Sequence, residues 1–215
     1  RRQRQMCIRD RNMAYSEHAR RYLADCGLPK ERTYVTGSPM AEVLHNNLAE
    51  IEASDVHRRL CLEKGKYILL SAHREENIDT EKNFLSLFTA INKMAEKYDM
   101  PILYSCHPRS RNRLAISGFQ FDSRVIQHEP LGFHDYNCLQ MNAFAVVSDS
   151  GTLPEESSFF TSVGHPFPAV CIRTSTERPE AIDKGDFIIA GIDEKSLLQA
   201  VDTAVELCKD DQHGI

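Results

Sequence analysis

The 215-residue sequence predicts an α/β fold with a doubly wound, Rossmann-like parallel sheet, and three observations support this prediction. Short apolar runs recur, the clearest at residues 67–72 (YILLSA), as expected for strands that are covered on both faces. Segments with apolar residues at helical spacing separate these runs, most clearly after Thr80. Strands and helices alternate along most of the chain, which is typical of a parallel sheet with helices packed on it.

The first part of the chain carries the weakest pattern. Residues 1–12 (RRQRQMCIRDRN) are basic and show no periodicity, so we interpret them as a disordered or non-native arm. A short helix is expected at 16–23, with Ser16 as its cap and a stop at Gly27. A brief strand follows at 33–36.

The remaining elements follow in a regular order. A helix is expected at 40–48, and the polar stretch at 49–66 could carry the crossing between two domains. Asp79 or Thr80 caps a helix that ends near residue 98 and buries one face, formed by Phe84, Leu87, Phe88, Ile91, Met94 and Ala95. Later strands are expected at 101–106, 125–126, 144–147, 169–172 and 187–190, and later helices at 110–117, 134–141, 155–162 and from Asp193 onward.

Composition excludes several classes of function. The net charge of −5 argues against a nucleic-acid binder, because there is no basic excess to contact a phosphate backbone. No apolar run is long enough for a membrane span. The seven cysteines are scattered and form no C-x-x-C pair, which favours a reducing, cytoplasmic setting. No histidine and cysteine cluster has metal-ligand spacing, so no metal is expected.

The segment at 143–156 (AFAVVSDSGTLPEE) is the strongest local candidate for a binding site. An apolar strand turns sharply at residues 148–151 and enters a helix with Pro154 in its first turn. A helix N-terminus presents unpaired N–H groups and the positive end of a dipole, which suits an anion such as phosphate. The alternative is an ordinary, well-capped turn from strand to helix, and this segment alone leaves both open.

Other strand ends favour the first interpretation. In parallel sheets, ligands bind beyond the carboxyl ends of the strands. Cationic or anion-binding residues follow four of the predicted strands: His73 and Arg74; His107 and Arg109; Ser150 and Gly151; and Arg173. Glu155 or Glu156 could accept both ribose hydroxyls of a nucleotide. Together these residues predict a nucleoside diphosphate ligand, although Arg173 could instead pair with Glu177 or Glu180.

Three motifs carry a family resemblance. They are HREEN at 73–77, SDSG at 148–151 with Glu155 and Glu156 behind it, and R-x-x-x-E-R-P-E at 173–180. In this order and spacing they resemble the non-hydrolysing UDP-N-acetylglucosamine 2-epimerase family. The residues of these motifs are most similar to those of the capsule and O-antigen branch, which forms UDP-N-acetyl-L-fucosamine. Thr152 stands where the family usually has a second glycine, which supports such a subgroup.

The resemblance implies a glycosyltransferase-B type fold in which residues 49–208 form the C-terminal, UDP-binding domain. Residues 13–48 would be the remnant of the first domain and the crossover, and 209–215 a tail. The chain would then be a C-terminal fragment, inactive by itself, of a cytoplasmic homodimer.

The resemblance also assigns the site. UDP-contacting positions are His73, Tyr136, Ser150, Gly151, Glu156 and Arg173, with His73 as the catalytic residue. Further sugar or diphosphate contacts would be Arg74, His107, Arg109, Glu177 and Arg178. The family removes the C2 proton, expels UDP to give a glycal-type intermediate, and adds UDP back with inverted C2, without a cofactor. Two alternatives stay open: a UDP-sugar binding module without catalysis, and a glycosyltransferase of the same architecture.

Overall fold

The computed structural model describes residues 11–73, 80–106, 108–173 and 187–209; within these, the side chains of residues 108 and 109 are not described. The chain divides into two compact units, Arg1–Val43 and Leu44–Ile215, which we describe separately.

The smaller unit contains two short parallel strands, β1 (Asn12–Ala14) and β2 (Thr33–Val35). Helix α2 (Glu17–Asp25) and the 3-10 turn η1 (Lys30–Arg32) connect them. The Ser16 hydroxyl accepts the N–H of Ala19 at 3.2 Å, so the predicted N-cap of this helix is confirmed. Helix α3 (Pro39–Asn46) follows and crosses the boundary between the units.

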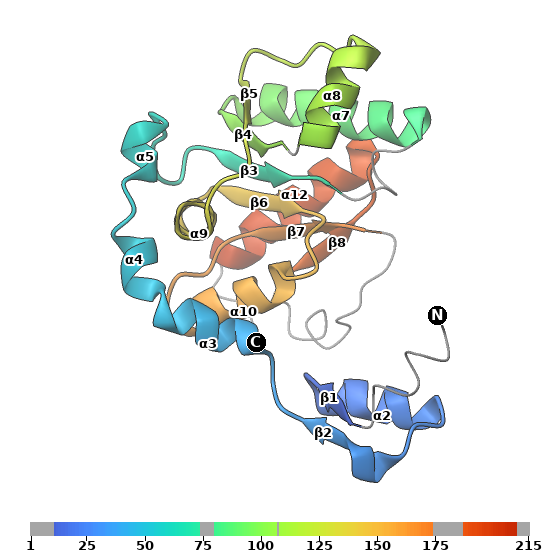
Figure 1. Ribbon diagram of the computed structural model, residues 1–215. Coiled ribbons are helices and arrows are strands. Elements are labelled where there is room, and N and C mark those ends of the chain that lie inside the picture. The colour runs from blue at the N-terminus through green and yellow to red at the C-terminus, as the bar shows by residue number, and fades with distance from the viewer. Residues whose placement is uncertain (1–10, 74–79, 107, 174–186, 210–215) are drawn as a thin grey trace. The chain divides into compact units, whose positions relative to one another are not determined.

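The larger unit is built on a six-stranded sheet, β5-β4-β3-β6-β7-β8, in which every pair of neighbours is parallel (Figure 1). Its strands are β3 (Ile68–Ser71), β4 (Ile102–Ser105), β5 (Val125–His128), β6 (Ala145–Ser148), β7 (Ala169–Ile172) and β8 (Ile188–Ala190). From β3 the chain first adds strands on one side and then returns to add β6 on the other side. The order therefore reverses between β3 and β6, and this switch point is where doubly wound sheets bind ligands.

Helices cover the sheet, as the sequence predicts. They are α7 (Glu81–Tyr98), α8 (Pro108–Ser117), α9 (Phe133–Met141), α10 (Leu153–Ser162) and α12 (Glu194–Lys209). Thr80 caps α7 by accepting the N–H of Asn83 at 3.2 Å, and the predicted apolar face of this helix is buried. Helices α7 and α12 pack on each other and share one core cluster with Ile68, Leu70 and other alternate strand residues. The intervening residues point to the opposite face because side chains alternate along a strand.

The polar stretch at 49–66 is part of the larger unit. It forms two short helices, α4 (Leu48–Glu52) and α5 (Val56–Arg59), which pack on α9. Their buried residues, Ile51 and Val56, are fully inaccessible to solvent. Asp135 of α9 accepts hydrogen bonds from Ser54 Oγ and Arg59 Nη2, both at 2.6 Å. These contacts fix α9, which carries one wall of the candidate site.

No helix among the described residues combines the length and the apolar character that a membrane span needs. None of the six cysteines in the described ranges forms a disulfide.

Candidate functional site

A cavity of about 390 Å³ lies at the carboxyl ends of β3, β4 and β6. It therefore occupies the switch point of the sheet. The lining residues come from the strand ends, from α9 and the loop before it, and from the turn into α10 and the first turn of that helix: Ser71, His73, Ser105, Pro130, Leu131, Tyr136, Asp149, Ser150, Gly151, Thr152 and Glu156. Four expected nucleotide contacts besides His73 are thus found together, namely Tyr136, Ser150, Gly151 and Glu156.

The turn from β6 into α10 forms one wall of this cavity. The N–H of Asp149 donates to the carbonyl of Ser71 at 3.0 Å, which continues the pairing of β6 with β3. The N–H of Ser150 then donates to Ser148 Oγ at 3.1 Å, and the N–H of Thr152 to Ser150 Oγ at 3.3 Å. Helix α10 begins at Leu153 with Pro154 in its first turn, as predicted. Its N-terminus adds a positive dipole end beside the cavity.

His73 stands directly after β3, on the other side of the switch point. Its Nε2 lies 2.9 Å from Ser71 Oγ, and its backbone N–H donates to Asp149 Oδ2 at 2.8 Å. Asp149 is only 2% exposed, and this part-buried bond links the ends of β3 and β6. The carboxylate of Asp149 binds the backbone N–H of His73 and thereby fixes the main chain from which the imidazole projects. The ring itself is exposed on the cavity, where a ligand can reach it.

Glu156 is the buried carboxylate of the site, at 7% exposure. Gln140 Nε2 donates to its Oε2 at 2.8 Å, and Thr152 Oγ1 donates to its Oε1 at 2.7 Å. Burial raises the pKa of Glu156, and the two hydrogen bonds oppose that rise because they favour the charged form. The carboxylate is thus an acceptor that is oriented from two sides and has restricted contact with water.

Tyr136 of α9 lines the cavity together with Leu131 and Pro130. Burial raises the pKa of its hydroxyl strongly, and the nearby charge of Glu156 adds to the rise. The phenol therefore stays neutral and can donate a hydrogen bond. These three residues give the lining a flat ring and apolar surface, whereas most of the other lining residues are polar.

Arg173 lies at the same edge of the sheet but does not line the cavity. It is 5% exposed and follows β7, where its backbone N–H donates to the carbonyl of Ala190 at 3.2 Å. Because β7 pairs with β6, with Cys171 opposite Ser148, Arg173 belongs to the same edge of the sheet as Ser150. It is not among the residues that line the cavity.

Five further predicted contacts cannot be placed. Arg74, His107, Glu177 and Arg178 lie outside the described residues, as does the side chain of Arg109 in α8. Among the described residues, no group of three or more histidine, cysteine, aspartate or glutamate side chains is arranged to hold a metal ion.

Comparison with known proteins identifies the family. The family model described as UDP-N-acetylglucosamine 2-epimerase matches residues 4–214. The chain belongs to the UDP-N-acetylglucosamine 2-epimerase family. The family prediction from the three motifs is therefore confirmed.

Individual family members agree in sequence and in structure. A UDP-N-acetylglucosamine 2-epimerase from Methanococcus maripaludis is 29% identical over 197 residues, which are 87% of this chain and 51% of that protein. The chain spans about half the length of the curated relatives it matches.

Solved structures of family members confirm the predicted fold. The UDP-N-acetylglucosamine 2-epimerase from Rickettsia bellii superposes with a TM-score of 0.82 at 38% identity, covering 92% of this chain and 51% of that one. The Methanocaldococcus jannaschii enzyme in complex with UDP-GlcNAc and UDP gives a TM-score of 0.82 at 27% identity, covering 91% and 54%. The α/β architecture with its parallel sheet is thus that of the epimerase and glycosyltransferase-B type structures.

Several residues of the site were missed from the sequence. Ser71 and Ser105 line the cavity, and Ser148 accepts a bond in the turn; each is the last residue of its strand. The recurrence of serine where an apolar run ends is a sequence pattern that could have indicated these three residues. Gln140 carried no signal, because it falls in a helix whose contacts with α10 depend on tertiary packing.

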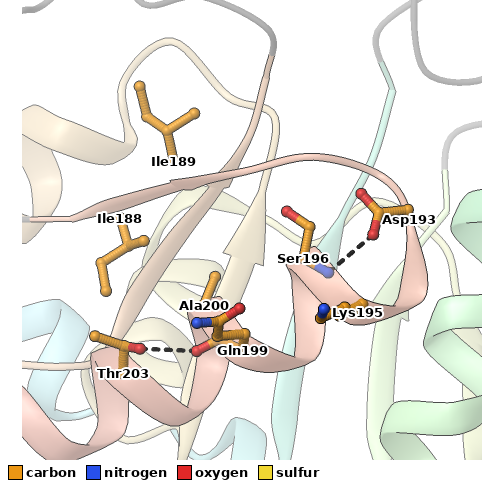
Figure 2. A pocket seen from close by; sticks show the side chains of 8 residues that line it. All are labelled: Ile188, Ile189, Asp193, Lys195, Ser196, Gln199, Ala200 and Thr203. Carbon is orange, nitrogen blue, oxygen red and sulfur yellow. Dashed lines mark hydrogen bonds between the residues drawn. The ribbon is translucent and has the colours of Figure 1, made fainter.

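A second cavity, of about 380 Å³, lies between β8 and α12 (Figure 2). Two of its polar side chains form hydrogen bonds within α12 or at its start: Asp193 Oδ1 accepts the N–H of Ser196 at 2.9 Å, and Thr203 Oγ1 donates to the carbonyl of Gln199 at 2.9 Å. The first cavity, at the switch point, is the one that five of the predicted nucleotide contacts line.

Proposed function

We propose that this chain binds the UDP group of a UDP-N-acetylhexosamine and acts as the UDP-holding part of a 2-epimerase. The observation that carries the proposal is the cavity at the switch point. It combines a helix N-terminus, a buried carboxylate and an aromatic wall in a chain that belongs to this family. The related enzyme from Methanocaldococcus jannaschii has been solved with UDP-GlcNAc and UDP.

Each part of UDP matches one part of the cavity. The backbone N–H of Gly151 and the helix dipole at the start of α10 suit the diphosphate, because they add no charge that must be neutralised elsewhere. The wall at Tyr136 and Leu131 suits the flat uracil ring. Glu156 suits the ribose, since a carboxylate accepts hydroxyl donors.

The chemistry that we propose is elimination followed by addition. A base takes the C2 proton, the electron pair of that bond forms a C1–C2 double bond, and the C1–O bond breaks to release UDP. UDP then adds to C1, and a proton returns to C2 from the other face. The sequence is redox-neutral. His73 and Arg173 would stabilise the charge that grows on the leaving diphosphate, which is the transition-state role of cations at such sites.

The proton-transferring carboxylates at C2 are not assigned to Glu75, Glu76 or Glu177. We propose that they lie in a part of the enzyme that this chain does not contain, and that this chain corresponds to the C-terminal half of its relatives. The aligned part of the Methanococcus maripaludis enzyme is 51% of that protein, which supports this proposal. The UDP-binding domain would then be a unit that binds but does not turn over substrate alone.

We propose the substrate branch from the motifs and the cellular setting from the cysteines. The HREEN segment and Thr152 in place of a glycine favour a UDP-HexNAc epimerase of the capsule and O-antigen type, which makes a precursor of a surface polysaccharide. The cysteines, none of them in a disulfide in the described ranges, fit a cytoplasmic enzyme. A homodimer is proposed from the family resemblance.

Calorimetry on this chain tests the binding step. We expect UDP to bind, and His73→Ala to weaken binding by about tenfold through loss of a donor to the diphosphate. A matched control is His134→Ala, whose ring bonds Asn47 at 2.9 Å and does not line the cavity. It should leave the affinity unchanged. No UDP binding by the folded chain would contradict the proposal.

Solvent exchange tests the reaction. The gene product that carries this chain, expressed from its natural start codon, is incubated with UDP-HexNAc in deuterated water. We expect deuterium at C2 of the recovered sugar. UDP binding without exchange would indicate a binding module, and irreversible release of UDP that depends on an acceptor would indicate a glycosyltransferase.

A further inference from the structure

The carboxylate of Glu156 accepts hydrogen bonds from two side chains, one on α9 and one just before α10. Gln140 of α9 donates to Oε2 at 2.8 Å, and Thr152, before α10, donates to Oε1 at 2.7 Å. An ionised carboxylate has about four acceptor positions, so these two bonds leave about two for a ligand. Glu156 itself lines the cavity, and the remaining acceptor positions are those that a ligand can use.

Gln140 cannot touch a ligand in this cavity. It is 0% exposed and is not among the lining residues. Its Oε1 is buried and has no hydrogen-bond partner in the described part of the chain. A buried polar atom without a partner destabilises a fold, and methionine would fill a similar volume without that cost. The presence of glutamine is therefore explained by the bond that its amide donates to Glu156.

Thr152 fixes the other oxygen. An ionised Glu156 can only accept, so the single hydroxyl proton of Thr152 points to Oε1. Ser150 Oγ, 2.9 Å from Thr152 Oγ1, must then donate to Thr152. The result is a directed chain from Ser150 through Thr152 to Glu156. This chain connects the phosphate-facing turn with the carboxylate.

We propose that Gln140 and Thr152 are positioning residues that hold Glu156 as acceptor for the two adjacent hydroxyls of a ribonucleotide, so that the site selects ribo- over 2′-deoxyribonucleotides. The inference rests on the proposed function, because it places a uridine nucleotide in this cavity. Ribose has two neighbouring hydroxyl donors and 2′-deoxyribose has one. A correctly oriented carboxylate accepts a hydrogen bond from each of the two ribose hydroxyls. A carboxylate that rotates freely discriminates less between ribose and 2′-deoxyribose.

Calorimetry with UDP and 2′-deoxy-UDP tests this role. The two ligands share base and diphosphate, so the ratio of their dissociation constants reports only the ribose contact. We expect the wild-type chain to bind UDP about tenfold more tightly than 2′-deoxy-UDP, as for one hydrogen bond to a charged acceptor. Thr152→Val and Gln140→Met should each reduce this ratio to about twofold or less by the loss of one orienting bond. Thr152→Ser keeps the hydroxyl and should keep the ratio.

The possible outcomes separate this inference from the proposed function. Folded Thr152→Val and Gln140→Met variants that retain the wild-type ratio would overturn the positioning role and leave UDP binding intact. Equal affinity of the wild type for both ligands would do the same. Failure of the wild type to bind either ligand would overturn both proposals. The two substitutions lie on different elements, so either one decides the question if the other does not fold.

Discussion

Replacing Glu156 by glutamine should make the fold more stable and the site less able to bind. The substitution keeps the shape and removes the charge of a residue that is only 7% exposed. Glutamine can keep both contacts: its Oε1 accepts from Gln140, and its amide nitrogen donates to Thr152. Thr152 can then donate to Ser150 instead, because either hydroxyl of that pair can be the donor.

The size of the effect follows from two opposing terms. Two charge-assisted hydrogen bonds become neutral ones, which costs about 1 kcal/mol each. Against this, the substitution removes the desolvation of a buried carboxylate, which costs several kcal/mol. We expect a net gain of about 1–3 kcal/mol in the free energy of unfolding at pH 8. For a chain of this size, each kcal/mol raises the melting temperature by about 2–4 °C.

The stability gain of Glu156→Gln depends on pH, and the direction of the pKa shift of Glu156 determines how. Burial raises the pKa of Glu156 above its ordinary value of 4.5, so the folded chain binds this proton more tightly than the unfolded chain. The wild type therefore loses stability as the pH rises from 4.5 through the raised value. Glutamine does not titrate. The advantage of the variant should be complete at pH 8 and disappear below pH 4.5.

Urea denaturation at a series of pH values measures this difference. The control is Glu155→Gln, which removes the same charge from the same helical turn at a less buried position and so cancels the effect of the helix dipole. A Glu156→Gln variant less stable than wild type at pH 8 would refute the reasoning. So would a stability gain that does not change with pH.

Three further perturbations test the packing that positions the site. Tyr67→Phe should lower the free energy of unfolding by about 1–2 kcal/mol, because the buried hydroxyl donates to the carbonyl of Leu139 at 2.6 Å; the urea midpoint reports it. Phe88→Ala should cost about 3–5 kcal/mol by opening a cavity in the core, measured by thermal denaturation with Phe88→Leu as the milder control. Lys97→Met, which removes an exposed ion pair with Asp202, should change the urea midpoint by less than the equivalent of about 1 kcal/mol, and a larger loss would contradict its surface character.

The sequence by itself determined the order of the strands from β3 to β8, the helices between them, and the edge of the sheet that carries the site, but it did not indicate β1, α4 or α5. Period-2 and period-3.6 patterns depend on local geometry, so the helix capped by Thr80 and the turn before Pro154 could be predicted from neighbouring residues. His73 and Ser150 were found for the same reason, since each follows an apolar run that ends abruptly.

Only the tertiary structure decided which side chains act together. Gln140 reaches Glu156 across 16 positions of sequence, and Asp149 meets the N–H of His73 across 76. Such pairs are set by strand register and by how α9 packs beside α10, and no local pattern records either. The same distinction explains Arg173, whose strand end is predictable but whose place outside the lined cavity is a matter of packing.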